Sequence, residues 1–243
     1  MNASANDPGL LDLSRVRGLL FDVDGTLSDT DDHWVERFTR FLAPLAGLFA
    51  DHDPRRFARW LVMSVETPAN FFYSLADRLG IDKPLFNFFN RLFQRSRSRH
   101  LPQDRFWIIP GIQEMLADLH RKYPLAVVSA RDEKATLAFL DLFGLTAYFD
   151  AVVTAHTCEH TKPFPEPVIF AAAALGLAPE DCLMVGDTIV DVKAGRLAGA
   201  QTVAVLCGFG QRAELEKAGA DVILENTTDL EQLFQDESSV AEQ

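Results

Sequence analysis

The sequence predicts an α/β protein that is built on a doubly wound parallel sheet and interrupted by a long α-helical insertion. Two observations predict this fold. From residue 111 onward, short apolar runs alternate with segments of helical periodicity, the pattern of parallel strands that helices cover on both faces. Residues 31–108 lack this alternation and instead read as several helices in succession.

The elements of the sheet domain follow one another in a regular order. The first predicted strand covers residues 16–24. Later predicted strands cover residues 125–130, 151–155, 182–187 and 202–208. The helices predicted between them cover residues 112–123, 133–144, 166–176 and 192–200. We therefore expect a Rossmann-like core formed by residues 1–30 and 109–243, with a helical domain over residues 31–108.

The insertion differs from the core in composition. It holds all three tryptophans and eleven of the nineteen phenylalanines, and its twelve Lys and Arg residues exceed its nine Asp and Glu residues. The whole chain nevertheless has a formal net charge of −12, which disfavours binding to nucleic acid through the general surface. The sequence thus predicts an aromatic, mildly basic helical domain inside an acidic α/β domain.

The overall composition indicates an ordinary folded protein of a reducing compartment. Hydrophobic residues make up 48% of the 243 residues and charged residues 24%, which excludes the disordered and fibrous classes. The three cysteines are odd in number and show no paired spacing, which favours free thiols over disulfides. Because we find no signal-peptide pattern and no apolar run of about 18 residues, we expect a cytoplasmic protein without a membrane partner, either a monomer or a homodimer.

Two carboxylates stand where the first strand ends, in the stretch "LLFDVDGT". Asp22 and Asp24 lie two residues apart, so strand alternation would place both on one side of the chain. Such close carboxylates repel each other unless a divalent cation shares their site, and Mg²⁺ prefers oxygen ligands of this kind. Gly25 would then allow a tight turn. A solvated turn at the strand end is the alternative interpretation of this motif alone.

Three further groups follow predicted strands, each with an ordinary alternative. Ser129 could hold a phosphate oxygen together with the backbone N–H groups after it, or it could cap a helix. Lys162, in the proline-rich loop "TKPFPEP", could bind an anion or be solvated. In "GDTIVD", Asp187 could complete a metal site, whereas Asp191 could hold a ligand or be an acid of a first helical turn.

Taken in order, these motifs resemble the four motifs of the haloacid dehalogenase superfamily. The set comprises "DVDGT", Ser129, Lys162 with "KPFPEP", and "GDTIVD". It resembles the phosphatase branch related to phosphoglycolate phosphatase, and the resemblance covers residues 16–225. In this family the helical insertion would be a mobile cap. Each motif is modest alone, but four motifs in order at strand ends make a strong signal.

The resemblance implies a role for each of these residues. Asp22 would be the nucleophile that forms an aspartyl phosphate, and Asp24 would protonate the leaving oxygen and later take a proton from water. Mg²⁺ would be held by Asp22, the backbone carbonyl of Asp24 and Asp187, supported by Asp191. Ser129 and Lys162 would hold the phosphoryl oxygens. The substrate-binding residues that we predict are Gly25, Thr26, Ser129, Ala130, Arg131 and Lys162.

The reaction implied is hydrolysis of a small phosphorylated metabolite. The acid at Asp24 favours phosphate esters, since the superfamily's dehalogenases and phosphonatases lack it. A phosphomutase would use the same four motifs, and a non-catalytic protein could keep the fold and dock a partner through the cap. Cap residues could also contact the substrate or could be a solvated helix face; the candidates are Arg91, Arg95, Arg97, Arg99 and His100.

Overall fold

The structure is a computed structural model that describes residues 11–29, 39, 42 and 106–240. The chain divides into two compact units, one formed by residues 1–30 and 106–243 and the other by residues 31–105. Nearly all of the described residues belong to the first unit. Apart from residues 39, 42 and 106–108, the predicted cap and its arginines lie outside the described residues, so the division into core and cap stays a prediction.

The core of the first unit is a six-stranded sheet in which every strand pair is parallel. Its strands are β1 (Gly18–Phe21), β2 (Leu125–Val128), β3 (Ala151–Val153), β4 (Cys182–Gly186), β5 (Gln201–Val205) and β6 (Val222–Leu224). They lie in the order β3-β2-β1-β4-β5-β6. This arrangement confirms the doubly wound, Rossmann-like fold, whose strand order reverses between β1 and β4.

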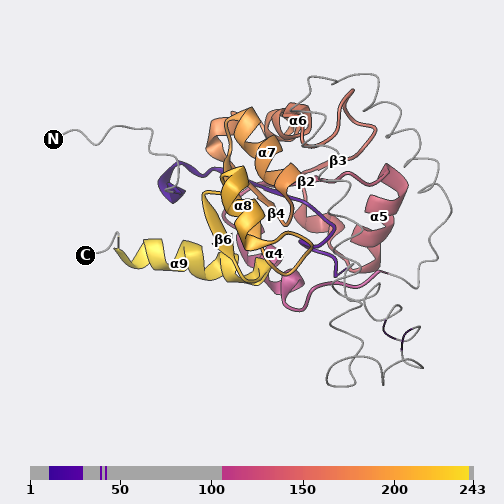
Figure 1. Ribbon diagram of the computed structural model, residues 1–243, viewed down its shortest axis with the longest axis horizontal. Coiled ribbons are helices and arrows are strands. Elements are labelled where there is room, and N and C mark those ends of the chain that lie inside the picture. The colour runs from indigo at the N-terminus through magenta and orange to yellow at the C-terminus, as the bar shows by residue number, and fades with distance from the viewer. Residues whose placement is uncertain (1–10, 30–38, 40–41, 43–105, 241–243) are drawn as a thin grey trace. The chain divides into compact units, whose positions relative to one another are not determined.

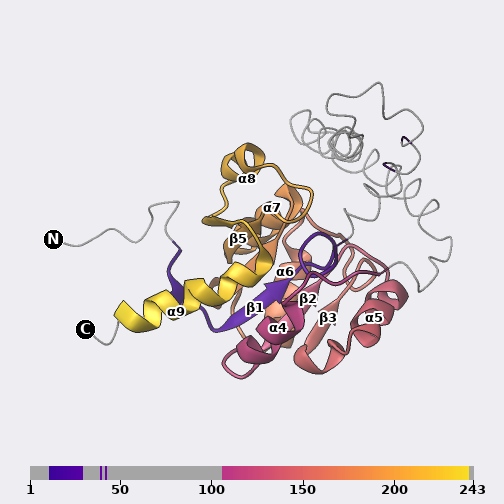
Figure 2. The same ribbon diagram turned by 90° about the horizontal axis from the view of Figure 1, so that it is seen from below.

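Helices cover both faces of the sheet (Figures 1 and 2). One face packs against α4 (Ile112–His120), α5 (Glu133–Leu142) and α9 (Leu230–Val240). The other face packs against α6 (Glu166–Ala174), α7 (Ile189–Ala198) and α8 (Arg212–Ala218). Figure 1 shows α6 and α7 above the sheet and α4 and α9 below it. Short 3₁₀ turns cover Leu13–Arg15, Thr146–Tyr148, Pro179–Asp181 and Thr227–Asp229.

The central strand explains why the predicted strands are apolar without alternation. In β1 the side chains of Leu19 and Phe21 join the hydrophobic cluster under α4 and α5, whereas Leu20 joins the cluster under α6 and α7. All three side chains are fully buried. Because successive strand residues point to opposite faces, a strand covered on both sides needs apolar residues throughout.

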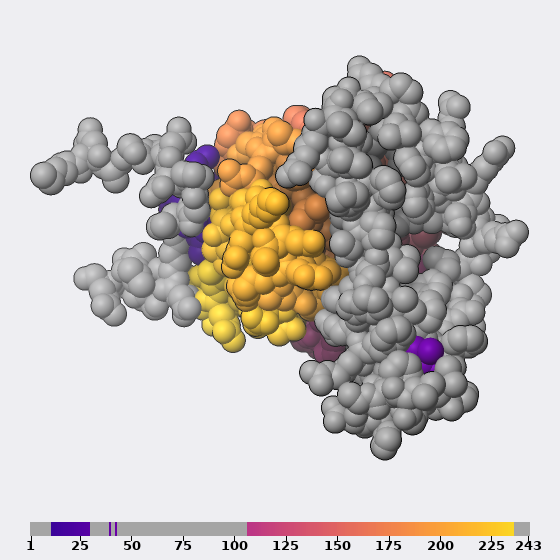
Figure 3. Space-filling view, viewed as in Figure 1, coloured from indigo at the N-terminus to yellow at the C-terminus, as the bar shows by residue number. Residues whose placement is uncertain are grey.

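Some elements differ from the sequence prediction. The strand β6 and the helices α8 and α9 are not among the predicted elements. The C-terminal part of the chain, coloured orange to yellow, forms much of the described surface seen in Figure 3. Helix α7 begins at Ile189, three residues before the predicted start, because Thr188 and Asp191 form a capping box at its N-terminus.

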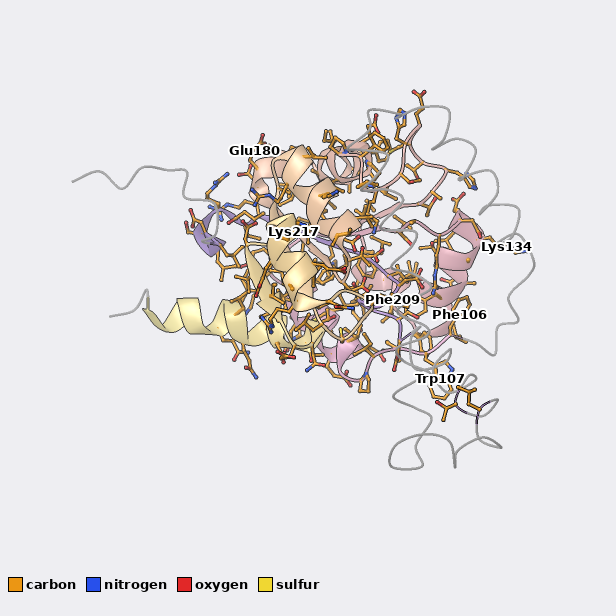
Figure 4. The ribbon with its side chains drawn as sticks, viewed as in Figure 1. Phe106, Trp107, Lys134, Glu180, Phe209 and Lys217 are labelled. Atoms are coloured by element: carbon orange, nitrogen blue, oxygen red, sulfur yellow. The ribbon has the colours of Figure 1, made fainter. Side chains whose placement is uncertain are left out.

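Residues on the two sides of the insertion pair with each other in the core. The backbone N–H of Asp29 donates to the carbonyl of Trp107 at 2.9 Å, and that of Ile109 donates to the carbonyl of Leu27 at 3.1 Å. This pairing leaves Phe106 beside α5, as Figure 4 shows. Among the helices that the structure describes, we find none with the length and apolar character needed to cross a bilayer.

Candidate active site

The predicted site residues meet at the carboxyl ends of three adjacent strands. Asp22 follows β1, Ser129 follows β2 and Asp187 follows β4. Backbone hydrogen bonds extend the sheet by one residue here, since Asp22 N–H donates to the Val185 carbonyl at 2.9 Å. Ligands of open α/β sheets bind at this end of the strands, beside the point where the strand order reverses. The topology therefore places these groups at the edge of the sheet where ligands of this fold class bind.

Lys162 joins two of the buried carboxylates. Its Nζ donates to Asp22 Oδ1 and to Asp191 Oδ1, each at 2.6 Å. The side chains of Lys162, Asp22 and Asp191 are only 2%, 9% and 1% exposed. The alternative interpretations of Asp22 as a solvated turn residue and of Lys162 as a solvated lysine are therefore excluded. Asp191 does cap α7, through Thr188, but its second oxygen also holds Lys162.

Burial dominates the electrostatics of the site. It raises the pKa of Asp22 to about 7; the nearby Asp191 and Asp24 carboxylates add to the rise, and Lys162 opposes it. Burial alone would lower the pKa of Lys162, but the carboxylates of Asp191 and Asp22 outweigh it, so that pKa lies above its ordinary value. The lysine ammonium is thus charged at neutral pH and stabilises the ionised form of Asp22.

Asp187 is held by the turn that follows β5. Its Oδ2 accepts a hydrogen bond from the backbone N–H of Phe209 at 2.7 Å, and Figure 4 shows Phe209 in this turn. Two glycines make room for the carboxylate, because a Cβ at Gly25 would lie 2.3 Å from Asp187 Oδ2 and one at Gly208 would lie 2.2 Å from it. Gly25 also has a positive φ of 74°, which disfavours other residues.

Three carboxylates form a group that fits a divalent cation. Asp22, Asp187 and Asp191 each offer an oxygen, these oxygens lie within 4.8 Å of one another, and all three residues are buried. Hard oxygen donors of this type suit Mg²⁺, and the two glycines beside Asp187 leave room for its carboxylate. The carboxylate of Asp24 does not belong to this group. The atom of Asp24 that is predicted to bind the metal is its backbone carbonyl oxygen.

The carboxylate of Asp24 faces Arg131 instead. Arg131 Nε donates to Asp24 Oδ2 at 2.6 Å, and Arg131 Nη2 donates to Asp24 Oδ1. The two residues thus form a bidentate ion pair across the loops that follow β1 and β2. From the sequence, both residues are predicted to lie in the site, but Arg131 is predicted as a substrate contact and the ion pair is not predicted.

The remaining predicted substrate-binding residues take different positions. Ser129 is buried, and its Oγ accepts from the Arg131 backbone N–H at 3.1 Å. Ser129 is not the N-cap of α5, because Asp132 fills that position. Ala130 is exposed. Thr26 is fully buried, and its carbonyl accepts from Thr227 Oγ1 at 2.6 Å.

Two contributors to the site are absent from the sequence prediction. Thr188 donates to Asp191 from its backbone N–H at 3.0 Å, and Phe209 donates to Asp187. The contact of Thr188 could have been predicted from the sequence, since Thr188 and Asp191 have the spacing of a capping box. The second lies in "CGFG", where two glycines directly after a predicted strand suggest close approach of the backbone to another group.

Comparison with known proteins gives consistent matches along most of the chain. A family model described as haloacid dehalogenase-like hydrolase matches residues 19–205. Pyrophosphatase PpaX from Anoxybacillus flavithermus is 30% identical over 217 residues, which are 88% of this chain and 95% of that protein. Pyrophosphatase PpaX from Bacillus cereus is 29% identical over 223 residues, 91% of this chain and 98% of that protein.

Solved structures share the fold. A hydrolase from Pseudomonas syringae has a TM-score of 0.61 and 22% identity, and the match covers 90% of this chain and 98% of that one. A haloacid dehalogenase superfamily hydrolase of subfamily IA from Geobacter sulfurreducens has a TM-score of 0.56 and 20% identity, covering 90% and 99%. All the predicted site residues lie within the segment that the family model matches.

Proposed function

The chain belongs to the haloacid dehalogenase-like hydrolase family, and on that premise we propose that it is a magnesium-dependent phosphatase of small phosphorylated metabolites. The observation that carries this proposal is the buried set formed by Asp22, Lys162 and Asp191, with Asp187 beside it. A buried carboxylate between a lysine and a candidate cation site is arranged to approach an anionic phosphoryl group, because the positive charges offset the repulsion.

Asp22 acts as the nucleophile in the proposed reaction. A carboxylate oxygen of Asp22 attacks phosphorus, and the bond from phosphorus to the leaving oxygen breaks. Asp24 gives a proton to that oxygen, so the product leaves as an alcohol. Asp24 then takes a proton from a water molecule that attacks the phosphorus. This second attack breaks the bond to Asp22, releases inorganic phosphate and restores the Asp22 carboxylate.

The other residues hold the phosphoryl group during both steps. Lys162 Nζ lies 2.6 Å from Asp22 Oδ1, close enough to contact an oxygen of a phosphoryl group on Asp22. Ser129 Oγ and the backbone N–H groups after it would bind the remaining oxygens. Asp22, Asp187 and the Asp24 carbonyl would hold Mg²⁺, with Asp191 in support. When bound, the ion would withdraw charge from the phosphoryl oxygens.

The setting that we propose is the cytoplasm, which the free state of Cys158, Cys182 and Cys207 supports. Because two relatives are named pyrophosphatase, inorganic pyrophosphate belongs among the candidate substrates beside phosphoglycolate, sugar phosphates and nucleotides.

The test is phosphate release from a panel of these substrates with Mg²⁺ and with EDTA, run beside Asp22→Asn. We expect release that needs both Mg²⁺ and Asp22, with the variant retaining the circular dichroism of the native protein. The loss expected on removal of a nucleophile is about 10⁴-fold or more. A phosphomutase would instead transfer the phosphoryl group within a sugar phosphate without net release. A folded protein with no turnover on any substrate would favour the partner-binding alternative.

A further inference from the structure

A carboxylate of the protein itself occupies the guanidinium fork of Arg131. Nε donates to Asp24 Oδ2 at 2.6 Å and Nη2 donates to Asp24 Oδ1, the parallel geometry in which arginine binds a carboxylate or a phosphate. An ionised carboxylate that accepts on both oxygens has no proton to give to the leaving oxygen. The ion pair must therefore open before Asp24 can act as an acid in the proposed reaction.

The guanidinium is the more enclosed partner of this pair. The side chain of Arg131 is 13% exposed, whereas that of Asp24 is 32% exposed. Arg131 Cζ lies 5.3 Å from the ring centroid of Phe106 and 5.8 Å from that of Phe139, distances at which a cation is attracted to an aromatic face. The backbone N–H of Arg131 also donates to Ser129 Oγ at 3.1 Å. When the pair opens, we expect the carboxylate to turn away and the guanidinium to keep its place.

The place of the fork relative to the substrate follows from that of Asp24. A general acid must come within hydrogen-bond distance of the leaving oxygen, and the fork lies within hydrogen-bond distance of Asp24. A group attached just beyond the leaving oxygen would therefore lie close to the guanidinium. Arg131 Nη1 is buried and has no hydrogen-bond partner among the described residues, so one nitrogen of the guanidinium is not used by the pair.

We propose that Arg131 is a specificity-determining residue: it binds a second anionic group of the substrate, a carboxylate or phosphate next to the leaving oxygen, in place of the Asp24 carboxylate. This inference rests on the proposed function and names the substrate class of that site. The incoming anion replaces the charge that Asp24 withdraws, so the exchange leaves no buried cation unpaired. A neutral leaving group offers the fork no such replacement, and Arg131 then stays with Asp24.

Two substrates that differ in one charge test this exchange. Phosphoglycolate carries a carboxylate beside its leaving oxygen, and phosphoglycolamide carries a neutral amide of nearly the same size at that position. Pyrophosphate is the third substrate, and its second anion is a phosphate. Phosphate release with Mg²⁺ gives kcat/KM for each substrate in the wild type, in Arg131→Gln and in Arg131→Lys. The matched control is Arg121→Gln, which removes an exposed arginine paired with Asp118.

We expect the wild type to prefer phosphoglycolate over the amide by about 10- to 100-fold in kcat/KM, the range that charge-assisted hydrogen bonds give. Arg131→Gln should reduce this preference to less than about threefold, mainly by raising KM for phosphoglycolate. Arg131→Lys should keep part of the preference, because an ammonium keeps the charge but lacks the fork. Arg121→Gln should show the wild-type preference. If the fork takes a phosphate rather than a carboxylate, the same loss falls on pyrophosphate relative to the amide.

Two results would overturn the inference: a wild type that hydrolyses the amide as efficiently as both anionic substrates, and an Arg131→Gln protein that loses activity equally on all three. If Arg131→Gln fails to fold, Arg131→Lys decides, and a preference as large as that of the wild type would contradict the role of the fork. Activity on p-nitrophenyl phosphate separates this failure from that of the proposed function. A wild type that hydrolyses it without preferring the anionic substrates contradicts the inference alone, whereas one that releases no phosphate from any substrate contradicts the proposed function as well.

Discussion

At the scale of single residues, the site depends on one buried lysine. Three buried carboxylates lie within 4.8 Å of one another, and such a group would be strongly destabilising if each were ionised and unpaired. Lys162 offsets two of them through contacts of 2.6 Å to Asp22 and Asp191. Removing one partner from a buried ion pair leaves an uncompensated charge. The lysine therefore stabilises the fold as well as the proposed phosphoryl intermediate.

We predict that Lys162→Ala lowers the free energy of unfolding by about 3–5 kcal/mol in EDTA, the range found when one member of a buried pair is removed. Adding Mg²⁺ should raise the thermal midpoint more in the variant than in the wild type, because the cation would compensate the carboxylates that the lysine no longer contacts. Urea unfolding and thermal scans with and without Mg²⁺ measure both effects.

The control for this variant is Lys134→Ala. Lys134 is exposed on α5 (Figure 4), and its replacement should change the stability by no more than about 0.5 kcal/mol. A Lys162→Ala protein as stable as the wild type in EDTA would contradict the proposed role of the ion pairs.

At the scale of elements, the turns after β1 and β5 shape the space around Asp187. Gly25 has a φ of 74°, and a Cβ there would lie 2.3 Å from Asp187 Oδ2. Gly176 provides a matched comparison in the turn after α6. It has a φ of 72°, but a Cβ added there would meet none of the described residues within 4 Å beyond its own chain neighbours. A comparison of alanine variants at Gly25 and Gly176 therefore separates the strain of a positive φ from the loss of space beside Asp187.

We predict that Gly25→Ala and Gly176→Ala both lose about 1–2 kcal/mol of stability, the usual penalty for a left-handed conformation. Only Gly25→Ala should also lose phosphatase activity and the stabilisation by Mg²⁺, because its methyl group displaces Asp187. Thermal unfolding and phosphate release measure the two effects. Full activity in Gly25→Ala would show that the space beside Asp187 is not needed.

At the scale of the whole molecule, the strand order explains why distant residues meet. Asp22, Ser129 and Asp187 are separated by more than 50 residues in each step along the chain, yet β1 pairs with both β2 and β4. Because all these strands are parallel, their carboxyl ends share one edge. The fold thus brings together motifs that the sequence presents far apart.

Much of this arrangement could be predicted from the sequence. Continuous apolar runs indicate buried parallel strands, and polar residues directly after such runs indicate the ligand-binding edge. The short strand β6 and helix α8 carry weaker patterns, since β6 has only three residues and α8 only seven. Tertiary packing, which is absent from a periodicity argument, stabilises such elements.

Contacts between side chains are harder to predict than elements. The spacing of Ser129 and Arg131 places both in one loop, but it does not show that the guanidinium turns to Asp24. The rings of Phe106, from the segment before α4, and Phe139, from α5, pack against the guanidinium, and periodicity does not show that these rings meet. The predicted positions were therefore informative about which residues meet, and less so about which atoms bond.

Acid quench of the first turnover shows whether Asp22 carries the phosphoryl group during the reaction. The protein is mixed with p-nitrophenyl phosphate and Mg²⁺, quenched within a turnover and digested for mass spectrometry. We predict a phosphoryl group on the peptide that contains Asp22, and none on the corresponding peptide of Asp22→Asn. Turnover without phosphorylation of Asp22, or with the phosphoryl group on another residue, would contradict it.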